Sequence, residues 1–270
     1  MKFTKIRLIG LVPVDLPVVH AKPSDQFTLK DADGLGPPEV DVSIASTLNT
    51  GGVYQGRRPQ SRQPVFRIGL NPDYRAGQTV GDLRNELYGM LTPGYPDVVQ
   101  VQIMNDDTIV AVAEGYVKNL TISPFSKDPE AQLTIDCLQP YLEAPDDLYV
   151  EPGGTKAAPV LTNAGSAPTG FHMELNLTAD MPSLVLFDAL NVNKMQFDYA
   201  FKAGDKLAFD TRPGSRGVWL TRDLLTTNII YAFSADSTWF LLYGGDNTFH
   251  TNSQAFTWGD VYYRPKYWGI

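Results

Sequence analysis

The stretch from Phe201 to Val218 carries the pattern that most constrains how this chain can fold. Lys206–Asp210 alternates polar and apolar residues, which is the period of a strand with one buried face. Tight turns are predicted on both sides of it, at Ala203–Asp205 and at Arg212–Ser215, because Gly supplies a positive φ and Pro pre-sets φ. An apolar run resumes at Val218. Turn, strand, turn and strand without a helical period predict an antiparallel hairpin inside a sandwich or barrel.

The remainder of the second half has the same character, with turn signals about every ten residues. Roughly eight short strands are predicted there, the pattern of a β-sandwich or jelly roll. The Pro- and Gly-rich stretch Glu151–Pro159 is the most linker-like segment, and it predicts two domains, residues 1–152 and 153–270. Besides the hairpin, strands are expected at Phe171–Thr178, Ser183–Phe187, Gln196–Phe201, Thr226–Ser234, Thr238–Tyr243 and Asp260–Arg264, with a turn at Gly244–Asn247.

The first domain is predicted to be a mainly β barrel or sandwich with one helix. The helix is expected at Thr79–Leu91, where Thr79 and Asp82 form a capping box and three leucines form an apolar stripe. Lys22–Pro38 is polar and ends in a cluster of turn residues. Strands are expected at Phe3–Val12, Val40–Ile44, Val65–Leu70, Val98–Ile103, Thr108–Ala113, Tyr116–Ser123 and Ala131–Leu138.

A long loop is predicted at Asn49–Pro64. Long ordered loops in compact domains tend to carry contacts, and Tyr and Arg are enriched at the cores of interfaces. One interpretation is therefore a docking arm for a partner subunit, anchored by Tyr54, Arg57, Arg58 and Arg62. The other is a solvated, flexible loop, and the residues alone leave both open.

Charge and cysteine content narrow the classes of function. Lys and Arg number 22 and Asp and Glu 30, a net charge of −8, most of it within residues 1–152. An acidic chain is not expected to bind nucleic acid, because phosphate binding needs Lys and Arg. Cys137 is the only cysteine, so no intrachain disulfide and no Cys-based metal site is expected. The first residues resemble neither a secretory signal nor a membrane span, which predicts folding in a cytoplasm.

No motif of catalysis stands out. His20, His172 and His250 are far apart and lack the spacing of metal ligands. Asp106 and Asp107 sit where a hairpin turn is expected, so they are interpreted as turn formers. A cell-wall hydrolase would need two carboxylates facing one cleft, and nothing in the sequence singles out a pair. We therefore expect no enzymatic activity, no cofactor and no metal.

Tryptophan is concentrated in the second half, at Trp219, Trp239, Trp258 and Trp268. Aromatic rings on the face of a sandwich can stack on sugar rings, and they can equally fill a core or a subunit interface. A candidate sugar platform of Trp219, Trp239 and Trp258 is thus the alternative to a purely structural role.

Several motifs of the second half resemble those of one known family. Leu161–Gly170 resembles the opening of the C-terminal domain in distal tail proteins of long-tailed, siphovirus-type bacteriophages. Ala203–Thr211 resembles that family's Gly-Asp hairpin. Leu241–Asn247, followed by Val261–Trp268, is similar to its turn and to its aromatic, basic last strand, although Gly244 stands where the family has Pro. The first half matches only in the order of its elements.

The resemblance implies a hexameric ring subunit without catalytic activity, located at the tail tip of the virion. The N-terminal domain would close the ring between the tail tube protein and the baseplate hub, with Tyr54, Arg57, Arg58 and Arg62 as candidate subunit or tube contacts. The C-terminal domain would be a galectin-like sandwich outside the ring. DNA and the tape measure protein would pass through the lumen, and an acidic lumen would repel phosphate. No membrane partner is implied.

Overall fold

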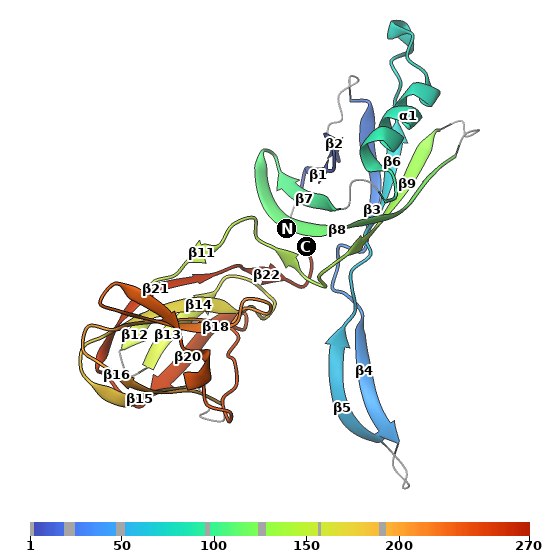
Figure 1. The fold of residues 1–270 in the computed structure, drawn as a ribbon. Coiled ribbons are helices and arrows are strands. Elements are labelled where there is room, and N and C mark those ends of the chain that lie inside the picture. Colours follow the sequence, from blue (N-terminus) through green and yellow to red (C-terminus); the bar gives the residue numbers. More distant parts are fainter. Residues whose placement is uncertain are drawn as a thin grey trace. The chain divides into compact units, whose positions relative to one another are not determined.

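The computed structural model describes residues 3–18, 25–46, 52–94, 98–123, 128–155, 158–188 and 193–270. By their contacts these residues form two compact units (Figure 1). Unit 1 contains Met1–Pro145 and Tyr267–Ile270, and unit 2 contains Asp146–Lys266. The contact-based division thus lies a few residues before the expected boundary near residue 152. That boundary, taken as the limit of independently folding domains, stays a prediction.

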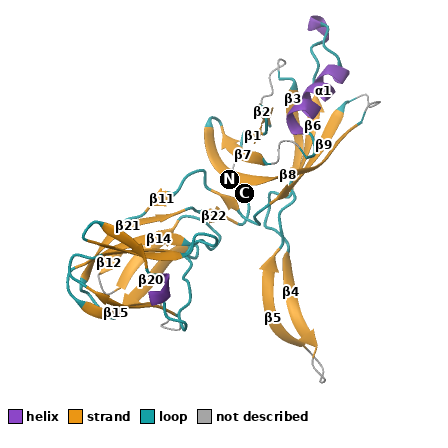
Figure 2. Ribbon diagram, in the orientation of Figure 1, coloured by secondary structure: helices purple, strands orange, loops and turns teal. Residues whose placement is uncertain are grey.

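Strands dominate both units (Figure 2), which confirms the prediction of a mainly β chain. In unit 1 the main sheet has the strand order β2-β1-β7-β8-β9-β6-β3, and β10 pairs with β8 and with β22 (Lys266–Tyr267). β4 and β5 form a separate two-stranded sheet. The elements are β1 (Lys5–Ile9), β2 (Pro13–Pro17), β3 (Phe27–Asp33), β4 (Val40–Ser46), β5 (Gly52–Pro59), β6 (Val65–Leu70), η1 (Tyr74–Ala76), α1 (Val80–Leu91), β7 (Val99–Asn105), β8 (Thr108–Ile122), β9 (Glu130–Cys137) and β10 (Leu142–Glu143).

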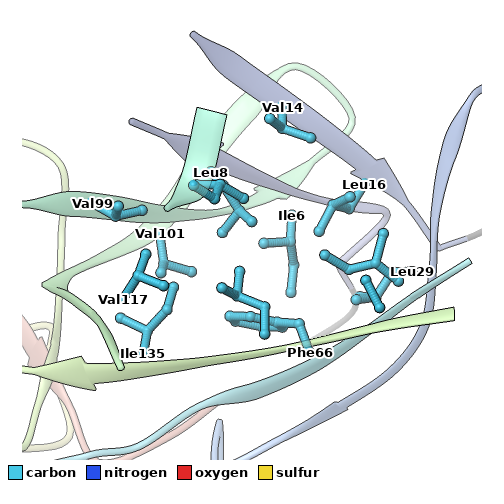
Figure 3. Close-up of a cluster of buried hydrophobic side chains, with 14 of the residues drawn as sticks. Ile6, Leu8, Val14, Leu16, Leu29, Phe66, Val99, Val101, Val117 and Ile135 are labelled. Carbon is cyan, nitrogen blue, oxygen red and sulfur yellow. The ribbon is translucent and has the colours of Figure 1, made fainter. Parts of the chain in front are cut away.

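The main sheet of unit 1 curls around its own core. Alternate residues of its strands, such as Ile6 and Leu8 of β1, are fully buried, as the strand period requires. Figure 3 shows these side chains pointing toward Phe66 of β6 and Ile135 of β9. The curl lets strands far apart in the sheet share one apolar interior.

The helix lies where the sequence predicts it. Thr79 is the N-cap, and the amide N–H of Asp82 donates to Thr79 Oγ1 at 3.2 Å while the Thr79 N–H donates to Asp82 Oδ2 at 2.8 Å. This is the reciprocal pattern of a capping box. The buried side chains Leu83, Leu87, Met90 and Leu91 face the sheet, where α1 contacts β6 and β8. No helix within the described ranges is long and apolar enough to cross a membrane.

Three expectations for unit 1 are wrong. Lys22–Pro38 was interpreted as a polar stretch without a strand, yet it contains β3, which is held by its pairing with β6 and by the burial of Phe27 and Leu29. Asn49–Pro64 was predicted to be a loop, and its described residues contain β5. The expected strands at Thr108–Ala113 and Tyr116–Ser123 are one long strand, β8.

Unit 2 is a sandwich of two sheets. One sheet has the order β11-β21-β14-β17-β18-β19 and the other the order β12-β13-β20-β15-β16. Phe171 and Phe209 from the first sheet and Phe197 from the second are buried in the core between them. The elements are β11 (Leu148–Tyr149), β12 (Gly153–Thr155), β13 (Ala158–Asn163), β14 (Phe171–Leu177), β15 (Met181–Asp188), β16 (Lys194–Phe201), β17 (Lys206–Asp210), β18 (Gly217–Arg222), β19 (Leu225–Asn228), η2 (Ile230–Ala232), β20 (Gly245–Thr251) and β21 (Phe256–Tyr263).

The hairpin predicted within Phe201–Val218 is confirmed, because β17 and β18 pair antiparallel from Lys206↔Thr221 to Asp210↔Gly217. Three nearby expectations are wrong. The expected strand Thr226–Ser234 is divided, because its first residues lie in β19 and Ile230–Ala232 form the short 3-10 helix η2. The segment Thr238–Tyr243 makes only one isolated bridge, Thr169↔Leu242, and its contacts with β16, such as the hydrogen bond from the Thr238 N–H to the Lys194 carbonyl, do not form a ladder. The expected turn at Gly244–Asn247 instead contains the start of β20.

Candidate functional site

The most prominent surface feature of unit 1 is the arm formed by β4 and β5, residues 40–46 and 52–59. Figure 1 shows it standing out from the main sheet, beyond the ends of β3 and β6. Its register pairs Ile44 with Tyr54, Val42 with Arg57 and Asp41 with Arg58. Side chains reinforce this pairing, since Gln60 Nε2 donates to Asp41 Oδ1 at 2.7 Å.

The arm exposes apolar side chains to an unusual degree. Val42, Ile44 and Tyr54 are 55%, 63% and 60% exposed, and Val40 and Val53 are exposed as well. An isolated two-stranded hairpin is marginally stable in water, and gathered exposed apolar residues are typical of interaction sites. The sequence predicted Tyr54 as a contact residue and Val40–Ile44 as a strand, but the alternation of that strand did not show that Val42 and Ile44 would be exposed.

The predicted arginines separate into two classes. Arg57 and Arg58 lie on β5 with exposed side chains. Arg62 lies beyond the arm and is only 2% exposed. Three of the four residues predicted for the interface, Tyr54, Arg57 and Arg58, therefore lie on the arm, whereas the fourth, Arg62, has almost no exposed surface.

Arg62 is an internal clamp of unit 1. Its guanidinium donates to the backbone carbonyl oxygens of Gly34 at 2.9 Å, Gly36 at 2.8 Å and Trp268 at 2.7 Å, and to that of Pro140 at 3.2 and 3.3 Å. Burial lowers the pKa of Arg62 from its ordinary value. Four carbonyls from three distant segments thus converge on one cation, and nothing in its local sequence marks Arg62 as different from Arg57 or Arg58.

The three candidate tryptophans of unit 2 do not share one surface. Trp258 packs against the core, edge-on to Phe256. Trp239 also packs against the core, stacks on Phe233 with ring centroids 4.1 Å apart, and lines a hollow beside β20. Trp219 lines a separate hollow over β14, β17 and β18. The structure therefore does not bring Trp219, Trp239 and Trp258 together as one platform.

Among the described residues, His172, His250 and the turn acids lie on separate elements of the fold. His172 and His250 lie on strands of different sheets, and His20 falls outside the described residues. Asp106 has a φ of 53° at the turn between β7 and β8, the position expected for a turn former. Within the part of the chain that the structure describes, no group of three or more His, Cys, Asp or Glu is placed to hold a metal ion. The thiol of Cys137 is buried, and burial raises its pKa to about 11.

Comparison with known proteins gives two informative matches. Residues 164–267 match the family described as the C-terminal domain of the siphovirus-type tail component. The crystal structure of the Dit protein of phage SPP1, described as a paradigm of the hub adsorption apparatus in phages that infect Gram-positive bacteria, superposes with a TM-score of 0.63. The alignment covers 97% of this chain and 98% of SPP1 Dit at 14% identity.

The search of curated protein sequences gives no match. Two further structures match more distantly. One is the phage P2 baseplate in its activated conformation with calcium, with a TM-score of 0.42, and the other is the same baseplate with strontium, with a TM-score of 0.38. The calcium structure is 9% identical to this chain, and the alignment covers 98% of this chain and 99% of that one. The strontium structure is 10% identical, and the alignment covers 97% of each chain. Residues 164–267 therefore resemble the C-terminal domain of a siphovirus-type tail component, and the chain as a whole has a Dit-like fold.

Proposed function

We propose that this chain is a ring-forming subunit of the tail tip, made in the host cytoplasm, which joins the tail tube to the baseplate hub. The observation that carries the proposal is the tail-component domain at residues 164–267 within a chain that has the fold of SPP1 Dit throughout. In this role the protein acts by assembly and carries out no reaction. Its partners are further copies of itself, six in the closed ring, together with the tail tube, hub and tape measure proteins.

The arm supplies the contact between subunits. A closed ring is built from heterologous interfaces, in which one patch of each subunit meets a different patch of the next. Val42, Ile44 and Tyr54 provide apolar area to bury, and burial of such area drives protein association. Arg57 and Arg58 lie on the same hairpin. The adjacent subunit in the ring is another copy of this chain, which has more carboxylates than basic side chains. Opposite charge at the rim then favours the correct register.

The acidic composition suits the lumen of such a ring. The chain has a net charge of −8, and a channel lined by carboxylates repels the phosphates of DNA. DNA would then slide through without specific binding, which is what a conduit for genome and tape measure requires.

Mass photometry of the purified chain tests the proposal. We expect a discrete species of six chains for the wild type. The double variants Arg57→Glu/Arg58→Glu and Ile44→Ser/Tyr54→Ser should shift the population to monomers while circular dichroism stays unchanged. The matched control is Arg67→Glu/Arg75→Glu, which reverses two exposed charges of unit 1 outside the arm and should still give rings.

Two outcomes contradict the proposal. A wild-type chain that remains monomeric at micromolar concentration in the presence of its tail tube protein would rule out the ring. Rings that persist in both arm variants would rule out the arm as the contact.

A further inference from the structure

The outward face of the six-stranded sheet of unit 2 carries polar and aromatic side chains. On β14 the alternation buries Phe171, Met173 and Leu175 in the core, so His172 and Glu174 point the other way. Their cross-strand neighbours on β17 are Asp210 and Ala208, and Ala208 in turn pairs with Trp219 of β18. Directly opposed residues share a face, and these side chains therefore lie together on the outside of the sandwich.

This face is hollowed beside Trp219. The hollow has a volume of about 450 Å³ and its lining includes His172, Glu174, Lys206, Trp219, Thr221 and Thr226. Hollows of about 300–1,000 Å³ suit small ligands. Its lining combines one large aromatic ring with hydroxyl, carboxylate, ammonium and imidazole groups, which can donate and accept hydrogen bonds. We call it the Trp219 hollow.

The charged groups that line the Trp219 hollow, and Asp210 and Arg212 next to it, are paired with one another. Lys206 Nζ lies 2.5 Å from Glu174 Oε2, and His172 Nε2 lies 3.8 Å from Glu174 Oε1. On the other side of the imidazole, Nδ1 lies 4.0 Å from Asp210 Oδ2, and Arg212 Nη2 is 2.5 Å from that same oxygen. Each carboxylate thus lies beside its own cation. The groups are fixed before any ligand arrives, and their charges balance, so a neutral ligand meets no uncompensated charge.

The indole of Trp219 is fixed by its neighbour two residues earlier. A Cβ added to Gly217 would come within 2.4 Å of Trp219 Cη2 and 2.6 Å of Cζ2. The six-membered ring therefore lies over Gly217, in space that only glycine leaves open. An aromatic ring laid along an exposed strand in this way offers a flat apolar surface beside the polar groups of the hollow.

We propose that the Trp219 hollow binds a neutral saccharide. One apolar face of a pyranose ring packs on the indole of Trp219, and the sugar hydroxyls exchange hydrogen bonds with Glu174, Lys206 and Thr226. A phosphate-bearing polymer is disfavoured, because Lys206, the ammonium group of the lining, is already paired with Glu174. The inference concerns unit 2 alone and stands or falls independently of the ring proposal.

The test uses the full chain and an array of neutral disaccharides of glucose, galactose and N-acetylglucosamine in α and β linkages, with polyglycerol phosphate as the charged probe. Binders are then measured by isothermal titration calorimetry. We expect millimolar or tighter binding of at least one neutral disaccharide. Trp219→Ala should weaken it more than tenfold, and Gly217→Ala, which displaces the indole without removing it, should weaken it severalfold. Thr226→Val, a nearly isosteric change on the exposed edge strand β19, should also weaken it.

The matched control is Trp239→Phe, which alters an aromatic residue of unit 2 outside the Trp219 hollow and should leave the affinity unchanged. Circular dichroism verifies that each variant is folded, and Thr226→Val keeps the test decisive if the changes at Trp219 and Gly217 disturb the sheet. Failure of the wild type to bind any neutral disaccharide overturns the inference. So does binding that survives both Trp219→Ala and Thr226→Val, or binding of polyglycerol phosphate alone.

Discussion

The carboxylate of Asp205 is buried and accepts three strong hydrogen bonds. Its oxygens accept from the backbone N–H of Lys202 at 2.7 Å and from Arg222 Nε and Nη2 at 2.7 and 2.6 Å. The hydrogen bond from Arg222 is the main cause that lowers the pKa of Asp205 below its ordinary value near 3.8. The contact with Lys202 spans the predicted turn at Ala203–Asp205, whereas Arg222 lies seventeen residues away in sequence and no local signal marks it as the partner of Asp205.

This arrangement predicts an acid dependence of the stability of unit 2. Because the pKa is lower in the folded state, the contribution of Asp205 is fully present above its unfolded pKa, near 4, and is lost as the pH falls through the folded pKa. Asp205→Asn should therefore be less stable than the wild type at pH 7, and the difference should shrink as the pH is lowered below about 4. Urea unfolding followed by tryptophan fluorescence measures it, since Trp219, Trp239 and Trp258 lie in unit 2.

Asp236→Asn, which alters an exposed carboxyl group of unit 2, is the control and should follow the wild type at every pH. A difference between Asp205→Asn and the wild type that stays constant, or grows, on acidification would contradict the assignment.

At the scale of single elements, the turn between β18 and β19 is strained. Arg222 pairs with Leu225, so Asp223 and Leu224 form a two-residue turn, with φ values of 51° and 66°. Positive φ at both central positions is what a type I′ turn needs, and Asn-Gly is the preferred pair for it. Leu224 is fully exposed, so its side chain makes no buried contact that would offset the cost of this backbone conformation.

Asp223→Asn/Leu224→Gly should therefore stabilise unit 2 by ~0.5–1 kcal/mol, through relief of the backbone strain. Urea unfolding of the double variant checks this expectation. The control is Leu225→Gly, one residue further along, which places glycine in β19 and should destabilise. If both variants lower the stability, the turn is not strained in the way its φ values indicate.

The sequence predicted helices and turns that are determined by neighbouring residues. It did not predict strands that form only because a partner strand lies beside them. The capping box at Thr79 and the turns around β17 are local, and the sequence located both. The residues of β5 contain glycine, arginine and proline, and they form a strand only because β4 lies beside them. The alternation in β4 was recognised, but alternation reports two different faces and not what covers them. The exposed apolar face of the arm was therefore missed.

At the scale of the whole chain, the motifs that carried the family resemblance turn out to be polar ties between segments of unit 2. Asn163 Nδ2 donates to the carbonyls of Ala167 and Leu242, and the Tyr243 N–H donates to Asn247 Oδ1. Such residues are constrained by geometry more than by hydrophobicity, which explains how short motifs marked the fold of unit 2. Unit 1 is held by apolar packing and by Arg62, neither of which leaves a short motif, and its assignment needed the structure.

The last four residues of the sequence belong to unit 1 and help to close it. Trp268 O accepts from Arg62, and the Ile270 N–H donates to the carbonyl of Leu35 at 3.2 Å. The side chains of Tyr267 and Ile270 pack against the core of unit 1. Gly269 permits this approach, because a Cβ there would come within 2.8 Å of the Gly36 backbone. A segment distant in sequence thus satisfies a buried cation and covers part of an apolar core.

Deletion of residues 267–270 should therefore lower the free energy of unfolding of unit 1 by about 3 kcal/mol, because a hydrogen bond to a charged group is lost and apolar surface is uncovered. Hydrogen-exchange mass spectrometry should show faster exchange in peptides around Leu35 and in β9, where Arg62 O accepts from the Cys137 N–H. Peptides of β17 and β18 should exchange as in the wild type, which serves as the internal control. Gly269→Ala should give a weaker form of the same pattern, because it disturbs the approach without removing Arg62 from its other carbonyls. Uniform faster exchange across both units, or none at all, would mean that these residues do not close unit 1.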